Sequence, residues 1–179
     1  MSLLSARPRL FGLSLAALIY LTDQWLKRMV YGSWGLLEEG DHLDLSTYFD
    51  LTRTHNYGIS LGLLTADSME MRWGLVAMTA AIALIVLVWL LREKKFGDIL
   101  PLALVLGGAA GNIHDRYRLG YVLDYADLHF GEFRPFLIFN LADAAITIGV
   151  VIILARSFLI REKADNNPAG EPATETNNA

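Results

Sequence analysis

The chain has 179 residues, of which 54% are hydrophobic and 19% are charged, and its formal net charge is -4. This balance is more apolar than that of an ordinary soluble domain and favours a membrane protein. The basic residues form no long stripe, so no nucleic-acid partner is predicted. Because the chain contains no cysteine, thiol nucleophiles, disulfides and cysteine-ligated metals are excluded. Serine, aspartate, glutamate and histidine remain as candidates for chemistry.

The first apolar segment covers residues 10–28 and follows a short head that ends in Arg7-Pro8-Arg9. Its uninterrupted apolar part has the length of a secretory signal sequence, but no small-residue cleavage site follows it. The segment is therefore predicted to be retained as a first membrane span. Lys27 and Arg28 are expected to extend their charged groups to the membrane surface from the end of this helix. Asp23 lies deeper and is expected to need a partner.

An extramembrane loop is predicted from Tyr31 to Ser68, where the composition becomes acidic and rich in glycine. Within this loop, Leu43 to Thr54 is rich in Leu, Thr, Tyr and Phe with partial alternation of apolar and polar residues. This pattern predicts a short hairpin or a curved pair of strands. The segment from Asn56 to Gly62 then turns back toward the membrane.

Three further apolar segments are each predicted to cross about 30 Å of hydrocarbon as helices that rise about 1.5 Å per residue. They cover residues 71–91, 99–115 and 137–159. The second of these three contains glycines whose missing side chains permit close helix packing, namely Gly107, Gly108 and Gly111. Residues 162–179 have too few apolar residues to order themselves and are predicted to form a disordered cytoplasmic tail.

Four spans place both termini on one side of the membrane and both long loops on the other. The compact basic cluster of Arg92, Lys94 and Lys95 favours a cytoplasmic location for the termini. Both long loops would then lie outside the cytoplasm. A second extramembrane hairpin is expected between the last two spans, at about residues 117–136.

The pattern Asn, two residues, Asp occurs twice, as Asn112 with Asp115 and as Asn140 with Asp143. Positions three apart share one face of a helix. Because the third span ends at the membrane face where the fourth begins, the two copies are expected to meet there. An acidic hairpin from Tyr121 to His129 lies between them, and its Asp124 is expected to fold back from the loop over Asp143.

Carboxylates set beside strongly apolar sequence are costly and are functional candidates by default. Two carboxylates in a poorly solvated site tend to share one proton, so that one can activate a water while the other donates to a peptide carbonyl. The amides of Asn112 and Asn140 are suited to donate hydrogen bonds to the aspartates or to a substrate backbone. Arg116 is suited to pair with a carboxylate or a lipid phosphate.

Other interpretations stay open at this point. Asp115 and Arg116 could form an interfacial ion pair, and Asp127 could be a structural loop acid. A metal-dependent membrane hydrolase is one alternative function, because several potential ligands lie within one short region: His114, Asp115, Asp124, Asp127 and His129. A non-enzymatic transport or assembly subunit that uses buried acids is another.

The chain resembles the lipoprotein signal peptidase family, also called signal peptidase II, which are integral-membrane aspartic peptidases of bacteria. The resemblance extends from Leu10 to about Phe158. It rests on Asp23-Gln24-Trp25-Leu26-Lys27, on Asn56-Tyr57-Gly58, on Gly107-Gly108-Ala109-Ala110-Gly111-Asn112-Ile113-His114-Asp115-Arg116, on Gly120-Tyr121-Val122-Leu123-Asp124-Tyr125-Ala126-Asp127 and on Phe139-Asn140-Leu141-Ala142-Asp143-Ala144-Ala145-Ile146.

The resemblance implies an all-α membrane protein with four transmembrane helices, a small extracytoplasmic β-cradle and a short interfacial helix, within a single domain at residues 1–161. The implied activity is that of an aspartic endopeptidase that removes the signal peptide from diacylglyceryl-modified prolipoproteins, cleaving before the lipidated cysteine. No metal or other cofactor is expected. The implied partners are the lipid-modified prolipoprotein, membrane lipids and a globomycin-type inhibitor. The expected form is a monomer in the bacterial cytoplasmic (inner) membrane, with its active site on the extracytoplasmic face.

Carried over residue by residue, the resemblance implies that Asp124 and Asp143 are the catalytic pair. The implied substrate-binding or supporting residues are Asp23, Lys27, Asn56, Asn112, Asp115, Arg116, Asn140 and Ala142. One segment departs from the family pattern. After Gly58 the family commonly has small residues and then a phenylalanine, whereas this chain reads Ile59-Ser60-Leu61-Gly62, which affects the shape of the lipid or inhibitor groove.

Overall fold

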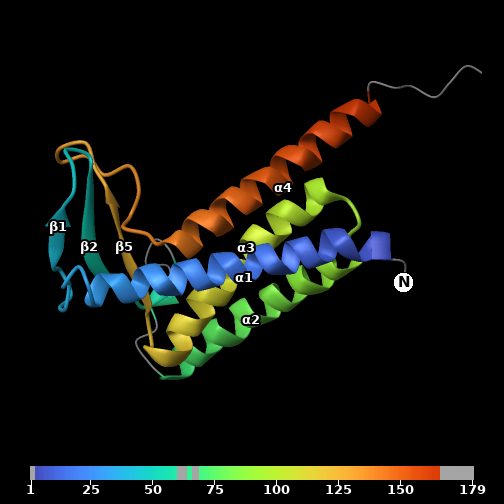
Figure 1. Ribbon diagram of the computed structural model, residues 1–179. Coiled ribbons are helices and arrows are strands. Elements are labelled where there is room, and N and C mark those ends of the chain that lie inside the picture. The colour runs from blue at the N-terminus through green and yellow to red at the C-terminus, as the bar shows by residue number, and fades with distance from the viewer. Residues whose placement is uncertain (1–2, 60–63, 66–68, 166–179) are drawn as a thin grey trace, which may run out of the picture.

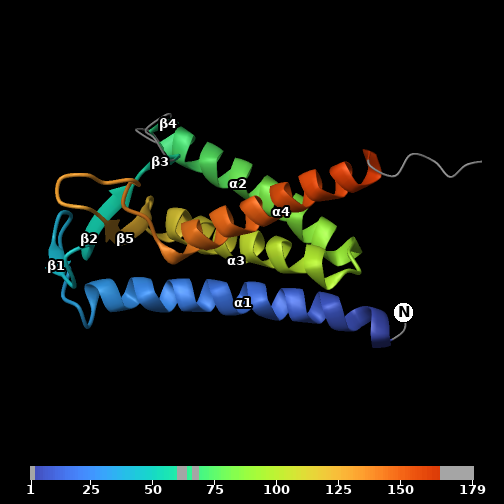
Figure 2. The same ribbon diagram turned by 90° about the horizontal axis from the view of Figure 1, so that it is seen from above.

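A computed structural model describes residues 3–59, 64–65 and 69–165 of the chain. Long helices make up most of it, and a small sheet lies across one end of them, opposite the N-terminus (Figures 1 and 2). The helices are α1 (Leu3–Tyr31), α2 (Met69–Arg92), α3 (Phe96–Arg118) and α4 (Leu141–Asp165).

Three of the described helices are long and apolar enough to cross a membrane, namely α2, α3 and the Leu141–Leu159 part of α4. The spans predicted at residues 71–91 and 99–115 lie within α2 and α3, and the one predicted at 137–159 overlaps α4, which begins four residues later at Leu141. α1 has 29 residues but carries Asp23, Gln24, Lys27 and Arg28 in its second half, which lowers its apolar character. The span predicted at residues 10–28 thus lies within a long helix, and the count of four spans stays a prediction.

α3 lies at the centre of the bundle and packs against the other three helices. Its glycines permit this packing. A Cβ atom on Gly107 would lie 2.6 Å from the carbonyl oxygen of Ala16 in α1, and one on Gly108 would collide with the carbonyl oxygen of Ala142 in α4. The predicted role of these glycines in close helix packing is therefore confirmed.

The sheet has three antiparallel strands in the order β1 (His42–Asp44), β2 (Phe49–Asn56) and β5 (Val122–Leu128). β1 and β2 pair within the segment predicted to hold a hairpin or strand pair, so that prediction is confirmed. A separate short ladder joins β3 (Gly58–Ile59) to β4 (Leu64–Thr65). In the described residues between α1 and α2 there is no helix, and the rest of that segment, residues 60–63 and 66–68, lies outside the described part.

The hairpin predicted between the last two spans forms only in part. β5 is a single strand that pairs with β2, with Asp124 opposite Thr54. The chain then returns through residues 129–139, and Phe139 forms an isolated antiparallel bridge with Ala126. Because β5 is buried along nearly its whole length, apolar residues occupy both of its faces and give no alternating pattern. Asp124 therefore lies on a strand in the middle of a paired segment and not on a loop.

A small core joins the sheet to the end of α1. It contains Val30 and Leu36 from the α1 side, Leu51 of β2, and Leu123 and Tyr125 of β5. Full burial of one such aliphatic side chain stabilises by about 1.5–3 kcal/mol. The core thus fixes β5 on the bundle. At the other end of the chain, α4 continues to Asp165, so the predicted domain boundary at residue 161 falls inside a helix; residues 166–179 are outside the described part.

Candidate active site

Asn140, at the start of α4, joins the two aspartates that the sequence singled out. Its Nδ2 atom donates a hydrogen bond of 2.6 Å to Asp124 Oδ1. Its Oδ1 atom accepts a 2.9 Å hydrogen bond from the backbone N–H of Asp143, and its own backbone N–H donates to Asp143 Oδ2 at 3.4 Å. This reciprocal pair is a capping box, in which residues three apart satisfy each other's backbone at a helix start. One side chain therefore contacts both acids.

Asp143 lies in the first turn of α4, where the aligned peptide dipoles favour a negative charge. Asn112 of α3 donates from Nδ2 to Asp143 Oδ1 at 2.7 Å. The predicted meeting of the end of the third span with the start of the fourth is thereby confirmed. The carboxylate of Asp143 thus accepts hydrogen bonds from Asn112 and from the backbone of Asn140.

Asp124 of β5 is only 2% exposed. Besides Asn140, it accepts a 3.1 Å hydrogen bond from Asn56 Nδ2 at the end of β2. Burial, followed by the nearby charge of Asp143, raises the pKa of Asp124 to about 7. Two interacting acids of this kind can hold one proton between them near neutral pH.

A buried charge cluster lies beside this pair, between α1 and α3. Lys27 Nζ lies 2.9 Å from Asp23 Oδ2 and 2.7 Å from Asp115 Oδ2. Asp23 therefore has the partner that it was expected to need. The prediction that Lys27 reaches the membrane surface is wrong, since Lys27 is 1% exposed. The ammonium group is held inside the bundle because it forms ion pairs with two buried carboxylates, and these replace its contacts with water.

Each acid of this cluster also holds the backbone next to Asp124 or Asp143. Asp23 Oδ1 accepts from the backbone N–H of Ala142 at 3.1 Å. Asp115 Oδ2 accepts from the backbone N–H of Leu123 at 3.2 Å. Ala142 precedes Asp143 and Leu123 precedes Asp124, so Lys27 connects the backbones that carry both acids.

Gln24 belongs to the same cluster, although sequence reasoning did not select it as a site residue. Its Nε2 atom donates to Asp115 Oδ1 at 2.9 Å and to Asp23 Oδ2 at 3.2 Å. The sequence does contain a sign of this role, because Gln24 places an amide beside Asp23 within an apolar segment. Burying an amide is costly unless it is hydrogen-bonded.

Arg116 does not form the ion pair with Asp115 that was left open as an alternative, because Asp115 pairs with Lys27. Arg116 Nη2 instead donates to the backbone carbonyl of Gly58 at 2.8 Å. Its buried Nε atom has no hydrogen-bond partner among the described residues. Arg116 thereby ties the end of α3 to the chain just after Asn56, the residue that donates to Asp124.

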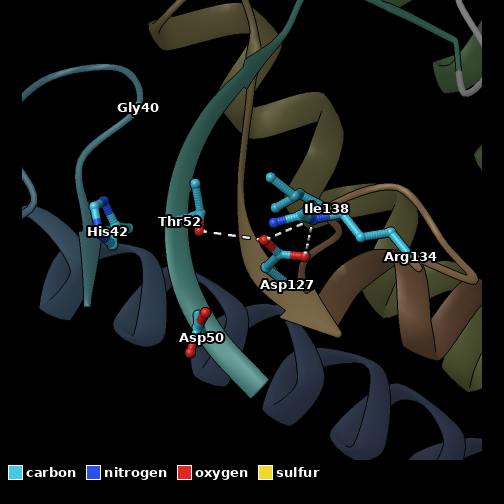
Figure 3. A pocket seen from close by; sticks show the side chains of 7 residues that line it. All are labelled: Gly40, His42, Asp50, Thr52, Asp127, Arg134 and Ile138. Atoms are coloured by element: carbon cyan, nitrogen blue, oxygen red, sulfur yellow. Dashed lines mark hydrogen bonds and ion pairs between the residues drawn. The ribbon is translucent and has the colours of Figure 1, made fainter. Parts of the chain in front are cut away.

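Asp127 lies in a separate pocket with Thr52 and Arg134 (Figure 3). It is three residues from Asp124 on the same strand, so its side chain points to the opposite face. Asp127 pairs with Arg134 at 3.1 Å and accepts a 3.5 Å hydrogen bond from Thr52. It lines an open pocket of about 340 Å³ whose other residues are Gly40, His42, Asp50, Thr52, Arg134 and Ile138. The alternative in which Asp127 is a structural acid fits these contacts.

The five potential metal ligands that the sequence places in one region are divided among separate partners. His114 Nδ1 lies 2.5 Å from the hydroxyl of Tyr20, and His129 Nε2 lies 2.8 Å from Asp50 Oδ2. Asp115, Asp124 and Asp127 have the partners given above. Within the part of the chain that the structure describes, no three His, Asp or Glu side chains gather as metal ligands would.

Comparison with known proteins yields one family. The family model described as Signal peptidase (SPase) II matches residues 15–159. The chain is 50% identical over 154 residues to a lipoprotein signal peptidase of Sphingopyxis alaskensis, covering 86% of this chain and 88% of that protein. It is 51% identical to one of Rhizorhabdus wittichii, covering 86% and 89%. It is 37% identical to one of Francisella tularensis, covering 88% and 98%.

Two solved structures, both described as bacterial membrane enzymes, share the fold. One superposes with a TM-score of 0.74 at 22% sequence identity, covering 90% of this chain and 94% of the other. The second has a TM-score of 0.69 at 24% identity, covering 82% and 91%. At these identities the likeness concerns the fold alone.

Proposed function

Because this chain belongs to the signal peptidase II family, we propose that it is an aspartic endopeptidase in which Asp124 and Asp143 are the catalytic pair. Membership in this family makes the chain a protease that removes signal peptides from prolipoproteins. With its apolar helices, it is a multi-pass membrane protein. The observation that carries the proposed mechanism is the contact of Asn140 with both acids.

The two acids have different roles in the proposed reaction. Asp143, at the start of α4 and hydrogen-bonded to the amide of Asn112, acts as the base. Asp124 holds the proton, because burial and the charge of Asp143 raise its pKa to about 7. The capping box fixes the two groups relative to each other at the moment of reaction.

The reaction begins with a water between the two acids. Asp143 takes a proton from this water while the water oxygen bonds to the scissile carbonyl carbon, and Asp124 gives its proton to the carbonyl oxygen. The resulting gem-diol collapses when the C–N bond breaks. The leaving nitrogen then takes the proton from Asp143, and one hydroxyl of the gem-diol returns a proton to Asp124. Both acids end as they began, and the step uses no metal.

The supporting residues hold this geometry. Lys27, Asp23 and Asp115 fix the backbone of both acids through the N–H groups of Ala142 and Leu123. Asn56 orients the second oxygen of Asp124. Arg116 holds the backbone just after Asn56 through its hydrogen bond to the carbonyl of Gly58.

We infer that α1 is a fourth membrane span. Its charged residues Asp23 and Lys27 are buried in the bundle, and Arg28 near its end is exposed. Large apolar side chains are exposed along the preceding part of the helix, namely Leu10, Phe11, Leu13, Leu18, Leu21 and Trp25. A helix that buries Asp23 and Lys27, has an exposed arginine near its end and turns leucines outward suits lipid on that side. The signal helix of the substrate would enter laterally between spans, with the sheet and active site on the extracytoplasmic face of the inner membrane.

The substrate assignment is tested with the purified protein in detergent and two precursors of one prolipoprotein, one carrying diacylglyceryl-cysteine and one unmodified. We expect cleavage of the modified precursor only, with the lipidated cysteine as the new N-terminal residue by mass spectrometry. Equal cleavage of both precursors would refute the role of the lipid. Loss of cleavage with a chelator, restored by added metal, would favour the metal-dependent alternative. An intact modified precursor would favour a transport or assembly role.

A further inference from the structure

Arg72, in the first turn of α2, binds two carbonyl groups at the end of α3. Its Nε atom donates to the carbonyl oxygen of Arg116 at 2.9 Å, and its Nη2 atom donates to that of Tyr117 at 2.7 Å. Figure 1 shows the start of α2 beside the end of α3. Sequence reasoning did not select Arg72, because these partners lie 44 and 45 residues away along the chain.

The two carbonyls belong to a helix end that needs partners from outside the helix. The last four carbonyl groups of a helix have no partner within it. At the end of α3, the backbone N–H of Leu119 donates to the carbonyl of Asp115 at 2.7 Å. The carbonyls of the next two residues accept from Arg72 instead. The positive charge of the guanidinium is also favoured there, because the helix dipole is negative at this end.

The same guanidinium lies against the turn that leads from α3 into β5. Gly120 in this turn has a φ of 92°, a conformation that favours glycine. A Cβ atom at Gly120 would lie 3.2 Å from Nη1 and 3.3 Å from Cζ of Arg72. Val122, two residues later, is the first residue of β5. Arg72 therefore contacts both the end of α3 and the backbone from which β5 starts.

The helix end that Arg72 binds is connected to the proposed catalytic acid on β5. Arg116, whose carbonyl accepts from Arg72, donates from its own side chain to the carbonyl of Gly58 at 2.8 Å. Two residues before Gly58, Asn56 donates to Asp124 at 3.1 Å. A shift of the end of α3 would therefore be passed on to the donor that orients Asp124.

The turn leads to the same acid by a shorter route. Asp124 lies four residues after Gly120, so at most about 14 Å of chain separates them. Asp124 also accepts the 2.6 Å hydrogen bond from Asn140 at the start of α4. A shift of the turn would thus change the place of Asp124 relative to α4, which carries Asp143.

We propose that Arg72 is a positioning residue for the reaction, which fixes the turn between α3 and β5 and so sets the place of Asp124 against Asp143. The inference rests on the proposed function, in which both acids must reach the same water. Misplacement of a reacting group by about 1 Å can cost about a hundredfold in rate. Arg72 acts through the backbone of other residues, so its loss is expected to slow the reaction without weakening substrate binding.

The test compares variants of the full chain in detergent, with the diacylglyceryl-modified prolipoprotein as substrate. Arg72→Met removes the donors and keeps an unbranched apolar side chain. The matched control is Arg118→Met, which removes the same charge from the same end of α3, where the side chain of Arg118 is exposed. Arg72→Lys keeps a cationic donor that can bind helix carbonyls. Circular dichroism at the assay temperature first shows that each variant is folded, and Arg72→Gln replaces Arg72→Met if that variant is not.

We expect Arg72→Met to lower kcat at least about tenfold relative to Arg118→Met and to leave KM within about twofold. Arg72→Lys is expected to recover kcat to within about threefold of the wild type, because it restores donors to the end of α3. Equal kcat values for Arg72→Met and Arg118→Met would overturn the proposal. So would a raised KM with an unchanged kcat, because Arg72 would then serve substrate binding.

Hydrogen exchange of backbone amides gives a second readout that does not depend on cleavage. We expect amides of residues 119–124 to exchange several-fold faster in Arg72→Met than in Arg118→Met, because the turn opens more often without its anchor. Unchanged exchange would contradict the proposal even if kcat fell. No cleavage by the wild type would refute the proposed function and with it the catalytic role of Arg72, whereas faster exchange would still show that Arg72 fixes the turn.

Discussion

Lys27 Nζ lies 2.7 Å from Asp115 Oδ2, in a part of the bundle where both side chains are almost fully buried. The same lysine lies 2.9 Å from Asp23. Asp115 accepts a hydrogen bond from the backbone of Leu123, and Asp23 accepts one from the backbone of Ala142. This one ammonium group is therefore connected to the residues that precede both proposed catalytic acids, Asp124 on β5 and Asp143 on α4.

Replacing Lys27 with methionine leaves two buried carboxylates without their cation. We expect Lys27→Met to lower the free energy of unfolding by about 3–5 kcal/mol, because an unpaired buried charge is not compensated by water. Thermal unfolding in detergent measures this loss. The matched control is Arg28→Met, since the side chain of Arg28 is exposed and its replacement is expected to change stability by less than about 0.5 kcal/mol. Equal effects of the two substitutions would contradict the account of the charge cluster.

A methyl group at Gly111 would enter the same cluster. A Cβ atom there would lie 2.5 Å from Asp23 Oδ2 and 3.4 Å from the Cβ atom of Ala142. We expect Gly111→Ala to cost about 1–3 kcal/mol of stability and to lower kcat by displacing the N–H of Ala142. Gly74→Ala in α2 is the control, since a Cβ atom there has no neighbour within 4 Å among the contacts considered. Normal turnover by a folded Gly111→Ala protein would show that this geometry is not needed.

The pH dependence of cleavage follows from the pKa of Asp124, which burial and the charge of Asp143 raise to about 7. If Asp124 is the acid, it must be protonated, so kcat/KM falls as the pH rises through about 7. The hydrogen bond from Asn56 favours the ionised form and lowers this pKa. Asn56→Ala therefore raises the pKa, and we expect the alkaline limb to move upward by up to about one pH unit.

The control for this measurement is Thr52→Ala on the same strand, because the hydroxyl of Thr52 donates to Asp127 and not to Asp124. Its pH profile is expected to match that of the wild type. Activity that rises instead of falling as the pH passes through about 7 would mean that Asp124 acts as the base, and an alkaline limb that Asn56→Ala leaves unchanged would mean that another group sets it.

The sequence predicted the meeting of two Asn-x-x-Asp patterns because both lie at the ends of clear apolar segments. It did not reveal that the two patterns differ in kind. Asn140 and Asp143 form a capping box at a helix start. Asn112 and Asp115 lie near a helix end, where each side chain contacts a different partner. The same three-residue spacing thus occurs in a capping box and in a pair near a helix end that has separate partners. Only the position of the pattern within its helix distinguishes the two cases.

One prediction failed and another held only in part, for reasons that lie beyond local sequence. A lysine at the end of an apolar run usually reaches toward water, but Lys27 has two acids as partners, one of which is on α3. The segment around Asp124 reads as a hairpin of its own, but its strand partner comes from the first loop. Both outcomes depend on contacts between distant residues, which single-sequence patterns do not contain.

The measurement that most directly tests the central claim compares cleavage of a diacylglyceryl-modified prolipoprotein by the wild type, Asp124→Asn and Asp143→Asn. Each substitution keeps the shape of the side chain and removes its ability to ionise. Asp127→Asn, an acid on the opposite face of the same strand, is the matched control. We predict that both dyad variants melt near the wild-type temperature and lose turnover by several orders of magnitude, while Asp127→Asn keeps turnover within a few-fold of the wild type. Near-normal turnover by a folded Asp124→Asn or Asp143→Asn protein would contradict the assignment of that aspartate to catalysis.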